Sequence, residues 1–596
     1  MSGAQRQLAE AIRGSARGQE SSENVPPHAN LDSCTRGVHS QLASSAPSTP
    51  VARPARLCRN PPTGGEKPTR RSISMFPERF NLARYLLEHN LEAGRGDKLA
   101  LRWRDEAHTY AGLCAASSRL ARAMVELGLR QEERVLIALS DRPEFSHAFF
   151  GTLKAGAVFT MVNPLNEEAA LADLLEYTRA RIAIIDAELA PVFERLAPKA
   201  PHLLHTIVAG GASSKERPEL AHGQHALLDL VQQAPAGEFC VDTHLHDVAG
   251  WLFTSGSTGR PKAAVHFHED FAFNVEQYAK GVLGIHESDV TAGVPKLFFG
   301  YATGTNLMFP FAVGGSTVLF SERSTPERLF DLIEEERPTI LTSVPTMIGR
   351  MLALEEEASA PRDLASLRLV LSAGEKLPEA LQVRWQERCG VEILDGIGSA
   401  ELFHIYISNR PGAVRPGSLG QAVPGYEPMV VDEDGRELPA GETGRLIVRG
   451  ESAGLCYWQA HAASKETFRG DTVWSGDLFR RDADGYYYCE GRADELLKVG
   501  GRWVAPHEVE ECLLRHDAVA QAAVVGFTDG EGLVKPRAFI VCHGGHSSDE
   551  LLAAALQTWV KEDLAPHKYP RRVDFLVDLP KNDRGKVNRR ALRELE

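Results

Sequence analysis

The segment from Thr254 to Lys262 reads Thr-Ser-Gly-Ser-Thr-Gly-Arg-Pro-Lys and has the composition of an anion-binding loop. Its hydroxyl groups donate hydrogen bonds, its glycines allow backbone N–H groups to face an anion, and Lys262 supplies positive charge. The spacing does not fit the Gly-x4-Gly-Lys-Ser/Thr phosphate loop. These residue types favour a polyphosphate ligand, although a Ser/Gly-rich surface turn has the same composition.

Five further segments carry side chains of the kinds that bind nucleotides. They read SAGE (372–375), DGIGSAE (395–401), WSGD (474–477), GRAD (491–494) and PKNDRGKV (580–587). Carboxylates can bind a hard cation or ribose hydroxyls, and a lysine can stabilise charge on phosphate. Taken singly, each segment is equally well explained as a turn or as solvated surface.

These segments must be positioned by an alternation of short apolar runs and amphipathic stretches. Strands are expected at residues 99–103, 135–139, 181–187, 316–320, 339–344, 367–374 and 391–398, and helices at 325–338 and 378–390. Alternation of strand and helix is typical of α/β layers with mostly parallel sheet. We therefore expect a large multi-layer α/β domain over residues 75–491.

From residue 492 onward the pattern changes to that of a small α+β domain. Strands are expected at residues 520–527 and 535–542, and helices at 507–516 and 551–564. The second domain is therefore expected over residues 492–596.

Composition limits the class of protein. The chain has 596 residues, of which 43% are hydrophobic and 24% are charged, as in ordinary globular enzymes with two or more domains. The formal net charge of −14 argues against general binding of nucleic acid. No apolar run is long enough to cross a bilayer, and none of the nine cysteines forms a Cys-x-x-Cys pair. We expect a cytoplasmic protein that has no membrane partner.

Residues 1–74 differ from the rest of the chain. They are rich in Ser, Pro, Arg and Ala, lack hydrophobic periodicity and carry more basic than acidic residues. Such a segment cannot bury enough apolar surface to fold. A disordered tail, a transit peptide and translated sequence before the true start are the three interpretations. The acidic residues Glu20, Glu23 and Asp32 disfavour a transit peptide, so a non-native start or a dispensable tail is preferred.

In their order and spacing, the six motifs resemble those of the adenylate-forming superfamily, which contains acyl-CoA synthetases, luciferases and peptide-synthetase adenylation domains. The resemblance extends over residues 76–596. It implies an AMP-forming acid–CoA ligase. A carboxylic acid and ATP would give acyl-AMP and pyrophosphate, and coenzyme A would then displace AMP. ATP, Mg²⁺ and coenzyme A are the implied cofactors and co-substrates.

The resemblance also implies roles for individual residues. Glu401 matches the magnesium-binding glutamate, Lys586 matches the catalytic lysine of adenylation, and Asp477 matches the aspartate that binds ribose. The phosphate loop would comprise Thr254, Ser255, Gly256, Ser257, Thr258, Gly259 and the catalytic Lys262. Adenine and the rest of the nucleotide would be flanked by Ala373, Gly374, Glu375, Asp395, Gly396 and Arg492.

The second half-reaction would use a different arrangement of the domains. In relatives the small domain rotates about a hinge, which Asp494 matches, so that Lys586 leaves the site before the thiol attacks. The face presented to coenzyme A would include Gly500 and Gly501, where glycine permits close approach of a thin ligand.

One position departs from the family pattern. Ala400 stands where a threonine usually precedes the magnesium-binding glutamate, so a hydroxyl that would bind the α-phosphate is missing. One hydrogen bond contributes about 0.5–1.5 kcal/mol, which predicts a slower enzyme and not an inactive one. A non-catalytic nucleotide-binding homologue is kept as an alternative.

The substrate is expected to be benzoate or a substituted benzoate. The segment KLFFGY (296–301) has no acid to hold an amino group, and LFFGY (297–301) with DGIGSAELFHIYISNRPG (395–412) is similar to benzoate–CoA ligases. The pocket would be lined by Phe299, Gly300, Tyr301, Gly304, Ile397, Gly398 and His404. Aromatic rings and glycines make a thin slot for a planar ring.

Two matters stay open. A short or branched aliphatic acid is the alternative substrate, because one methyl or hydroxyl contributes only about 1–3 kcal/mol to selectivity. The expected partners are small molecules alone, with homodimer formation undecided.

Overall fold

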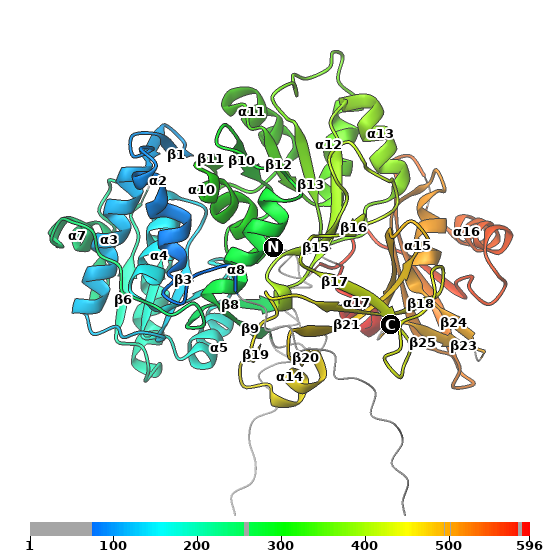
Figure 1. Cartoon of the computed structure of the whole chain (residues 1–596). Coiled ribbons are helices and arrows are strands. Elements are labelled where there is room, and N and C mark those ends of the chain that lie inside the picture. The colour runs from blue at the N-terminus through cyan, green and yellow to red at the C-terminus, as the bar shows by residue number, and fades with distance from the viewer. Residues whose placement is uncertain are drawn as a thin grey trace, which may run out of the picture. The chain divides into compact units, whose positions relative to one another are not determined.

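The computed structural model describes residues 74–211, 213–254, 261–493, 495–500, 502–546, 548–581 and 587–595, without the side chain of Trp503. The N-terminal extension therefore lies outside the described residues, apart from Ser74. The described part is a mixed α/β structure with mostly parallel central sheets, as the alternation of strand and helix predicted (Figure 1).

Eight strands form one sheet, in the order β19-β9-β8-β4-β3-β5-β6-β7. They are β3 (Arg134–Ala138), β4 (Val158–Met161), β5 (Ile182–Ile185), β6 (His205–Val208), β7 (Gln224–Ala226), β8 (Val248–Thr254), β9 (Lys262–Phe267) and β19 (Cys456–Tyr457). Neighbours from β8 to β7 are parallel, and β9 and β19 are added antiparallel at one edge. Every residue of β4 and β5 is buried, as is typical of parallel strands covered on both faces.

A nine-stranded sheet has the order β16-β15-β14-β13-β12-β10-β11-β1-β2. Its strands are β1 (Leu99–Trp103), β2 (Glu106–Thr109), β10 (Val290–Gly293), β11 (Ser316–Leu319), β12 (Ile340–Ser343), β13 (Leu369–Ser372), β14 (Ile393–Gly398), β15 (Ile405–Ser408) and β16 (Gln421–Ala422). The strands from β14 to β1 are parallel, whereas β2, β15 and β16 pair antiparallel at the two edges.

Three amphipathic helices cover this nine-stranded sheet and lie together in Figure 1. They are α11 (Pro326–Glu336), α12 (Pro345–Glu356) and α13 (Glu379–Cys389). In α11 the Thr325 hydroxyl accepts a hydrogen bond from the Arg328 backbone N–H, Pro326 occupies the first turn, and Arg337 ends the helix in the left-handed conformation. Leu329, Trp385 and their neighbours form a continuous core with the strands beneath.

The remaining helices of the large part connect or cover the two sheets. They are η1 (Arg84–Glu88), α2 (His89–Glu92), α3 (Tyr110–Glu126), α4 (Pro143–Lys154), α5 (Glu168–Thr178), η2 (Ala187–Leu189), α6 (Ala190–Leu196), η3 (Ala197–Lys199), α7 (Leu227–Gln233), α8 (His268–Asn274), η4 (Val275–Lys280), α9 (Gly300–Thr303), η5 (Gly304–Met308), α10 (Phe309–Val313), η6 (Ala400–Leu402) and α14 (His461–Thr467).

A third sheet of five strands is antiparallel and was not expected from the alternation of strand and helix. It has the order β17-β18-β21-β20, with β22 paired to β21. Its strands are β17 (Glu427–Val431), β18 (Thr443–Arg449), β20 (Phe468–Arg469), β21 (Thr472–Arg481) and β22 (Tyr487–Arg492). This sheet carries Asp477 and Arg492, two of the predicted nucleotide-binding residues.

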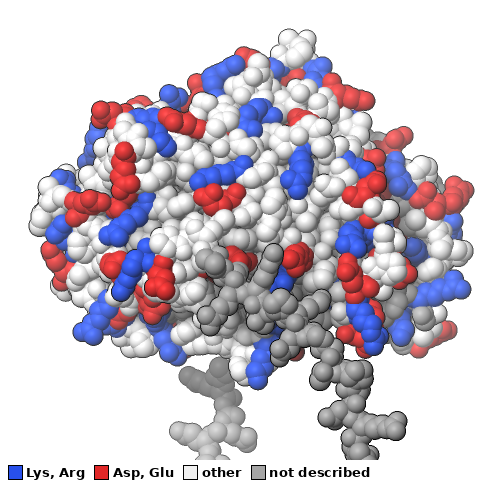
Figure 2. All heavy atoms as spheres, viewed as in Figure 1, with Lys and Arg blue, Asp and Glu red and all other residues white. Residues whose placement is uncertain are grey.

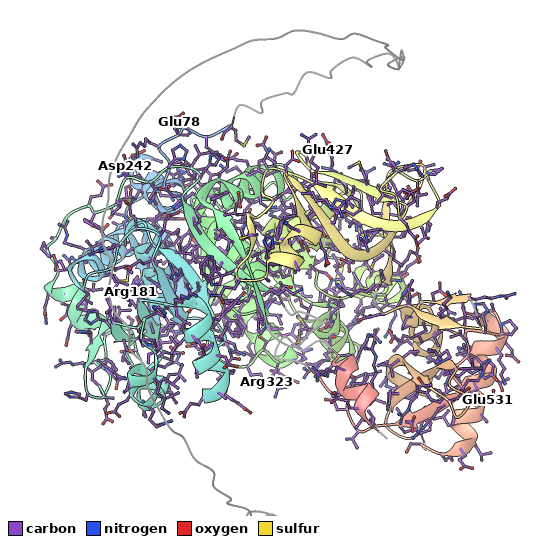
Figure 3. All side chains as sticks on the ribbon, turned by 90° about the horizontal axis from the view of Figure 1, so that it is seen from below. Glu78, Arg181, Asp242, Arg323, Glu427 and Glu531 are labelled. Atoms are coloured by element: carbon purple, nitrogen blue, oxygen red, sulfur yellow. The ribbon has the colours of Figure 1, made fainter. Side chains whose placement is uncertain are left out.

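The C-terminal elements enclose a hydrophobic core of their own, which includes Val509, Ile540 and Leu556. The elements are β23 (Leu497–Val499), β24 (Arg502–Val504), α15 (Pro506–Leu514), β25 (Val519–Thr528), β26 (Val534–Cys542), α16 (Glu550–Asp563), β27 (Arg572–Phe575) and α17 (Arg589–Glu594). Figure 3 marks the turn between β25 and β26 with Glu531. The boundary at residues 491 and 492 remains a prediction, as does the hinge.

Each strand and helix expected from the sequence is present, with ends that differ by no more than two residues. No helix among the described residues is long and apolar enough to cross a membrane. On the face shown in Figure 2, basic and acidic side chains are interspersed and do not form a large patch of one sign.

Candidate active site

The predicted phosphate loop connects two antiparallel strands at the edge of the eight-stranded sheet. Thr254 is the last residue of β8 and pairs with Lys262, the first residue of β9. The two ends of the loop are therefore held side by side, as in a β-hairpin. Ser255, Gly256, Ser257, Thr258 and Gly259 lie outside the described residues.

One tyrosine, Tyr457, contacts both Lys262 and Glu401, and it was not predicted from the sequence. The Lys262 ammonium lies 5.3 Å from the centre of the Tyr457 ring, a cation–π distance. The Tyr457 hydroxyl donates a hydrogen bond of 2.5 Å to Glu401 Oε1. Burial and the Glu401 carboxylate raise the pKa of Tyr457, so its hydroxyl keeps its proton and remains a donor. β19 pairs Tyr457 with Ala264 of β9, which explains how residues distant in sequence come together.

Asp477 and Arg492 lie side by side on two neighbouring strands of the five-stranded sheet. They are register partners on β21 and β22, and Arg492 Nη1 lies 3.4 Å from Asp477 Oδ1. A side chain at Gly476 would clash with the guanidinium, at 2.7 Å from Nη2. Burial raises the pKa of Tyr406, and the charges of Asp477 and Glu401 raise it further. Asp477 and Glu401 are thus both within electrostatic reach of one hydroxyl.

The SAGE segment follows β13 and faces the start of α12. Gly374 has φ of +91°, a conformation that glycine adopts readily, and the space where a Cβ would stand is empty. The Glu375 carboxylate accepts hydrogen bonds from the Thr346 hydroxyl, at 2.7 Å, and from its backbone N–H, at 3.2 Å. The Glu375 side chain therefore stabilises the first turn of α12. Ala373 is almost fully buried.

The Asp395 side chain is buried in the nine-stranded sheet and is hydrogen-bonded there. Its side chain accepts a hydrogen bond of 2.7 Å from the Ser372 hydroxyl, its register partner on β13, and the residue is 3% exposed. Burial raises the pKa of Asp395 to about 8, so the carboxyl is mostly protonated at neutral pH. A contact with the nucleotide at this position would therefore involve the backbone of Asp395 and Gly396 and not a carboxylate.

The free energy of unfolding of Asp395→Asn, relative to that of the wild type, is expected to increase as pH rises from about 4 to 8. The native carboxyl keeps its proton through this interval while the unfolded one releases it, so the wild type loses stability as pH rises through the window. Asparagine can accept the same bond from Ser372 and does not titrate. Urea unfolding of both proteins between pH 4 and 9 measures the difference, which should level off above pH 8. Parallel profiles would contradict the raised pKa.

A strained turn separates Glu401 from His404. Phe403 has φ of 69° and ψ of −58°, and the His404 backbone N–H donates to the Leu402 carbonyl at 2.9 Å, which defines a γ-turn of the rare, strained kind. Such strain persists only where the surroundings hold it, and it is concentrated at functional sites. The turn is the link between the predicted metal ligand and the predicted acid pocket.

Two residues of the predicted acid pocket, Tyr301 and His404, lie in contact with each other. His404 Nε2 lies 3.0 Å from the Tyr301 carbonyl, which can only accept, so Nε2 carries the proton. Burial lowers the pKa of His404 to about 4, so the ring is neutral and Nδ1 is an acceptor. A Cβ on Gly304 would stand 2.4 Å from the His404 ring, so glycine is required for this close packing.

Two buried polar atoms of this pocket lack a partner among the described residues. They are Tyr301 Oη and His404 Nδ1. An unsatisfied buried donor or acceptor costs about 1–3 kcal/mol, so these atoms are suited to a ligand group or a bound water. The main chain also begins a π-helix, η5, at Gly304, a feature that is frequent at functional sites.

The other predicted pocket residues surround this pair. Gly300 begins α9 beside Leu252, and Ile397 and Gly398 end β14. A Cβ on Gly398 would lie 2.5 Å from the His404 carbonyl oxygen, so glycine allows this backbone approach. Phe299 packs its ring 4.3 Å from that of Phe298.

Three residues predicted to act from the C-terminal domain or its hinge lie outside the described residues: Lys586, Asp494 and Gly501. Gly500 is described and has φ of +56° in the turn between β23 and β24. Four residues near the predicted site were not predicted from the sequence: Tyr457, Tyr406, His266 and Asp270. The spacing of His266 and Asp270, four residues apart just after Lys262, is the one signal that could have drawn attention to them.

Comparison with known proteins agrees with this geometry. Residues 87–458 match the family model of the AMP-binding enzyme, and residues 508–586 match that of the AMP-binding enzyme C-terminal domain. The chain is 42% identical to a benzoate–CoA ligase of Thauera aromatica over 521 residues, which are 87% of this chain and 96% of that protein.

Solved structures are similar as well. An anthranilate CoA ligase in complex with anthranoyl-AMP superposes with a TM-score of 0.80 at 38% identity, covering 87% of this chain and 98% of that one. A benzoate CoA ligase from Burkholderia xenovorans LB400 gives 0.78 at 38% identity, covering 86% and 100%. The chain belongs to the AMP-binding enzyme family, which confirms the resemblance to adenylate-forming enzymes.

Proposed function

We propose that this chain, an AMP-forming acid–CoA ligase, acts on benzoate or a substituted benzoate. The observation that supports this most directly is the cluster of aromatic rings around Tyr301 and His404, in which two buried polar atoms have no partner among the described residues. The relatives named above are two benzoate–CoA ligases and an anthranilate CoA ligase.

The residues present fit a magnesium ion that arrives with ATP. No three His, Cys, Asp or Glu side chains of the described residues gather into a metal site, so Glu401 would be a single protein ligand. Mg²⁺ commonly takes one or two carboxylates and completes its shell with phosphate oxygens and water. The ion would neutralise phosphate charge beside Glu401, and Tyr457 would hold that carboxylate in place.

The reaction would proceed in two displacements. A carboxylate oxygen of the acid attacks the α-phosphorus of ATP, the bond to the bridging oxygen breaks, and pyrophosphate leaves. Lys586 and Lys262 would stabilise the negative charge that accumulates, and Asp477 would hold the ribose. The thiolate of coenzyme A then attacks the acyl carbon, and the bond to AMP breaks.

Thr303 lies on the same short helix as Tyr301, but its hydroxyl is already used within the chain and is not available to a ring substituent. Its hydroxyl donates to the Leu297 carbonyl at 2.5 Å, and the residue is fully buried. The hydroxyl therefore stabilises the segment before α9. Tyr301 Oη and His404 Nδ1 are the better candidates for binding a hydroxyl or amino substituent.

The substrate panel is the decisive test of this proposal. We expect kcat/KM for benzoate or one of its 2-, 3- or 4-hydroxy or amino derivatives to exceed that for every aliphatic acid from acetate to octanoate by about tenfold or more. The assay follows AMP and thioester formation with ATP, Mg²⁺ and coenzyme A. An aliphatic acid that is tenfold better than every aromatic acid would exclude the aromatic pocket. Absence of exchange of labelled pyrophosphate into ATP with any acid would favour a non-catalytic homologue.

Gly304→Ala is expected to reduce kcat/KM for the best aromatic acid by about tenfold or more while leaving ATP affinity unchanged. A Cβ at this position would stand 2.4 Å from His404 Cδ2, so the ring must move and lose its bond to the Tyr301 carbonyl. Gly300→Ala is the graded comparison, because its Cβ would make ordinary contact with Leu252 at 3.4 Å and should have a smaller effect. Equal effects of the two substitutions would contradict this geometry.

A further inference from the structure

The turn that carries Glu401 is held from outside at three consecutive carbonyl groups. All three hydrogen bonds have ordinary lengths and come from other segments of the chain. The donors are His266 Nε2 to the Ala400 carbonyl at 2.7 Å, Gly454 N to Glu401 at 2.9 Å and Ser452 Oγ to Leu402 at 3.0 Å. Because the following γ-turn at Phe403 is strained, its geometry depends on such external contacts.

His266 differs from the other two donors because it lies on the strand that follows the predicted phosphate loop. It lies on β9, the strand that begins at Lys262, and residues 262, 264 and 266 share one face of that strand because side chains alternate. Tyr457, which pairs with Ala264, reaches Glu401 from the same face. β9 therefore holds the Glu401 segment at two points, once through the Tyr457 hydroxyl and once directly through His266.

Asp270 determines how His266 presents its ring. The Ala400 carbonyl can only accept, so His266 Nε2 must carry a proton. On the other side of the ring, Nδ1 lies 2.8 Å from Asp270 Oδ2, and that oxygen also accepts from the Phe267 backbone N–H at 3.1 Å. Both side chains are buried, His266 completely. The ring thus has one orientation, with Nε2 directed at Ala400.

The position of this contact coincides with the departure from the family pattern. His266 binds the carbonyl of Ala400, the residue that lacks the usual hydroxyl, and Ala400 directly precedes Glu401. Gly454 permits the packing, because a Cβ there would stand 2.9 Å from the Val265 carbonyl and 3.1 Å from the His266 ring.

We infer that His266 and Asp270 form a positioning pair that ties the phosphate-loop strand to the Glu401 turn and so sets the distance between Lys262 and Glu401. Both side chains are buried and act through the backbone of Ala400. The inference rests on the proposed role of Glu401 in binding Mg²⁺ with ATP. Misplacement of a catalytic group by about 1 Å can reduce a rate by about 100-fold, so the pair should matter for adenylation.

Two amide substitutions at His266 separate positioning from simple burial. His266→Gln places its terminal amide where Nε2 stands and can still donate to the Ala400 carbonyl. His266→Asn places its amide where Nδ1 stands, keeps the contact with Asp270 and does not reach Ala400. Isothermal titration of ATP with and without Mg²⁺ gives, for each full-length protein, the gain in affinity that Mg²⁺ provides. In His266→Asn, the factor by which Mg²⁺ increases ATP affinity should be at least about tenfold smaller than in wild type. In His266→Gln, the same factor should stay within about threefold of wild type.

The half-reactions provide a second readout. His266→Asn should slow pyrophosphate exchange by about 10- to 100-fold and leave thioester formation from supplied acyl-AMP nearly unchanged. Asp270→Asn can donate to His266 Nδ1 and should preserve exchange, whereas Asp270→Ala should not. His268→Asn is the matched control, because His268 is fully buried on α8 and accepts only from the Leu82 backbone N–H at 3.2 Å. It should lower the melting temperature without changing the gain from Mg²⁺.

The outcomes distinguish this inference from the proposed function. Equal losses in His266→Asn and His266→Gln, or an unchanged gain from Mg²⁺ in His266→Asn, would overturn the positioning pair alone. A wild-type protein whose ATP affinity does not respond to Mg²⁺ would overturn the role of Glu401 and, with it, this inference.

Discussion

Lys586→Ala should reduce acyl-adenylate formation by about 10³-fold or more and leave thioester formation from supplied acyl-AMP largely intact. The ammonium would stabilise charge only while the carboxylate attacks the α-phosphorus, and preorganised charge of this kind is usually the largest catalytic contribution. In the second half-reaction the lysine would have left the site with the rotated domain. Pyrophosphate exchange measures the first half-reaction, and release of AMP from acyl-AMP and coenzyme A measures the second.

Lys581→Ala is the matched control for this substitution. Lys581 lies in the same PKNDRGKV segment, its ammonium is 3.3 Å from Asp578 Oδ1, and its backbone forms a bridge with Val587. A surface pair of this kind contributes about 0–1 kcal/mol, so both half-reactions should remain near wild type. If Lys586→Ala impaired the two half-reactions equally, the lysine would be structural or the domains would not rearrange.

Local patterns were sufficient to predict the elements of the two large sheets. The apolar runs at β3, β5 and β13 are short and bounded by polar residues, and helices such as α11 carry start signals at Thr325 and Pro326. The antiparallel sheet that contains Asp477 was not anticipated. Its long strands β18 and β21 consist largely of half-buried or exposed residues and each contains a glycine, so their sequence resembles connecting loops more than the apolar runs of a parallel sheet.

The candidate active-site motifs were identifiable because each is contiguous in the chain. Thr254 and Lys262 belong to one loop, and Asp395 and Glu401 belong to one segment. The contacts that hold these motifs together are long-range. Tyr457 reaches Glu401 across 56 residues, and His266 reaches Ala400 across 134. No local period or composition signals such a pair.

Burial also changes the protonation and the hydrogen-bond partners of a side chain, and the sequence does not show which single residues are buried. Asp395 is a carboxylate by composition, yet in its buried site the pKa is raised to about 8. Thr303 is polar by composition, yet its hydroxyl is used by the Leu297 carbonyl. His404 is buried and its Nδ1 has no partner among the described residues, and its place in the acid pocket stays a prediction.

Glu401→Gln should reduce pyrophosphate exchange by about 10²–10³-fold and abolish most of the dependence of ATP affinity on Mg²⁺. The substitution removes the negative charge that a hard cation requires, yet the Gln carbonyl oxygen can still accept the hydrogen bond from Tyr457. The turn should therefore keep its geometry, and the melting temperature should change by no more than a surface substitution would cause.

Tyr457→Phe is the complementary variant, because it keeps the carboxylate and removes the hydroxyl that holds it. Its ring can still lie beneath the Lys262 ammonium and against Phe468, whose ring centre is 5.0 Å away. We expect a smaller decrease in exchange, about tenfold, that excess Mg²⁺ partly restores, because the charge remains and only its position is less well defined. Titration of Mg²⁺ in the exchange assay compares the two variants directly. If Tyr457→Phe were as impaired as Glu401→Gln at saturating Mg²⁺, position and not charge would be the contribution of Glu401.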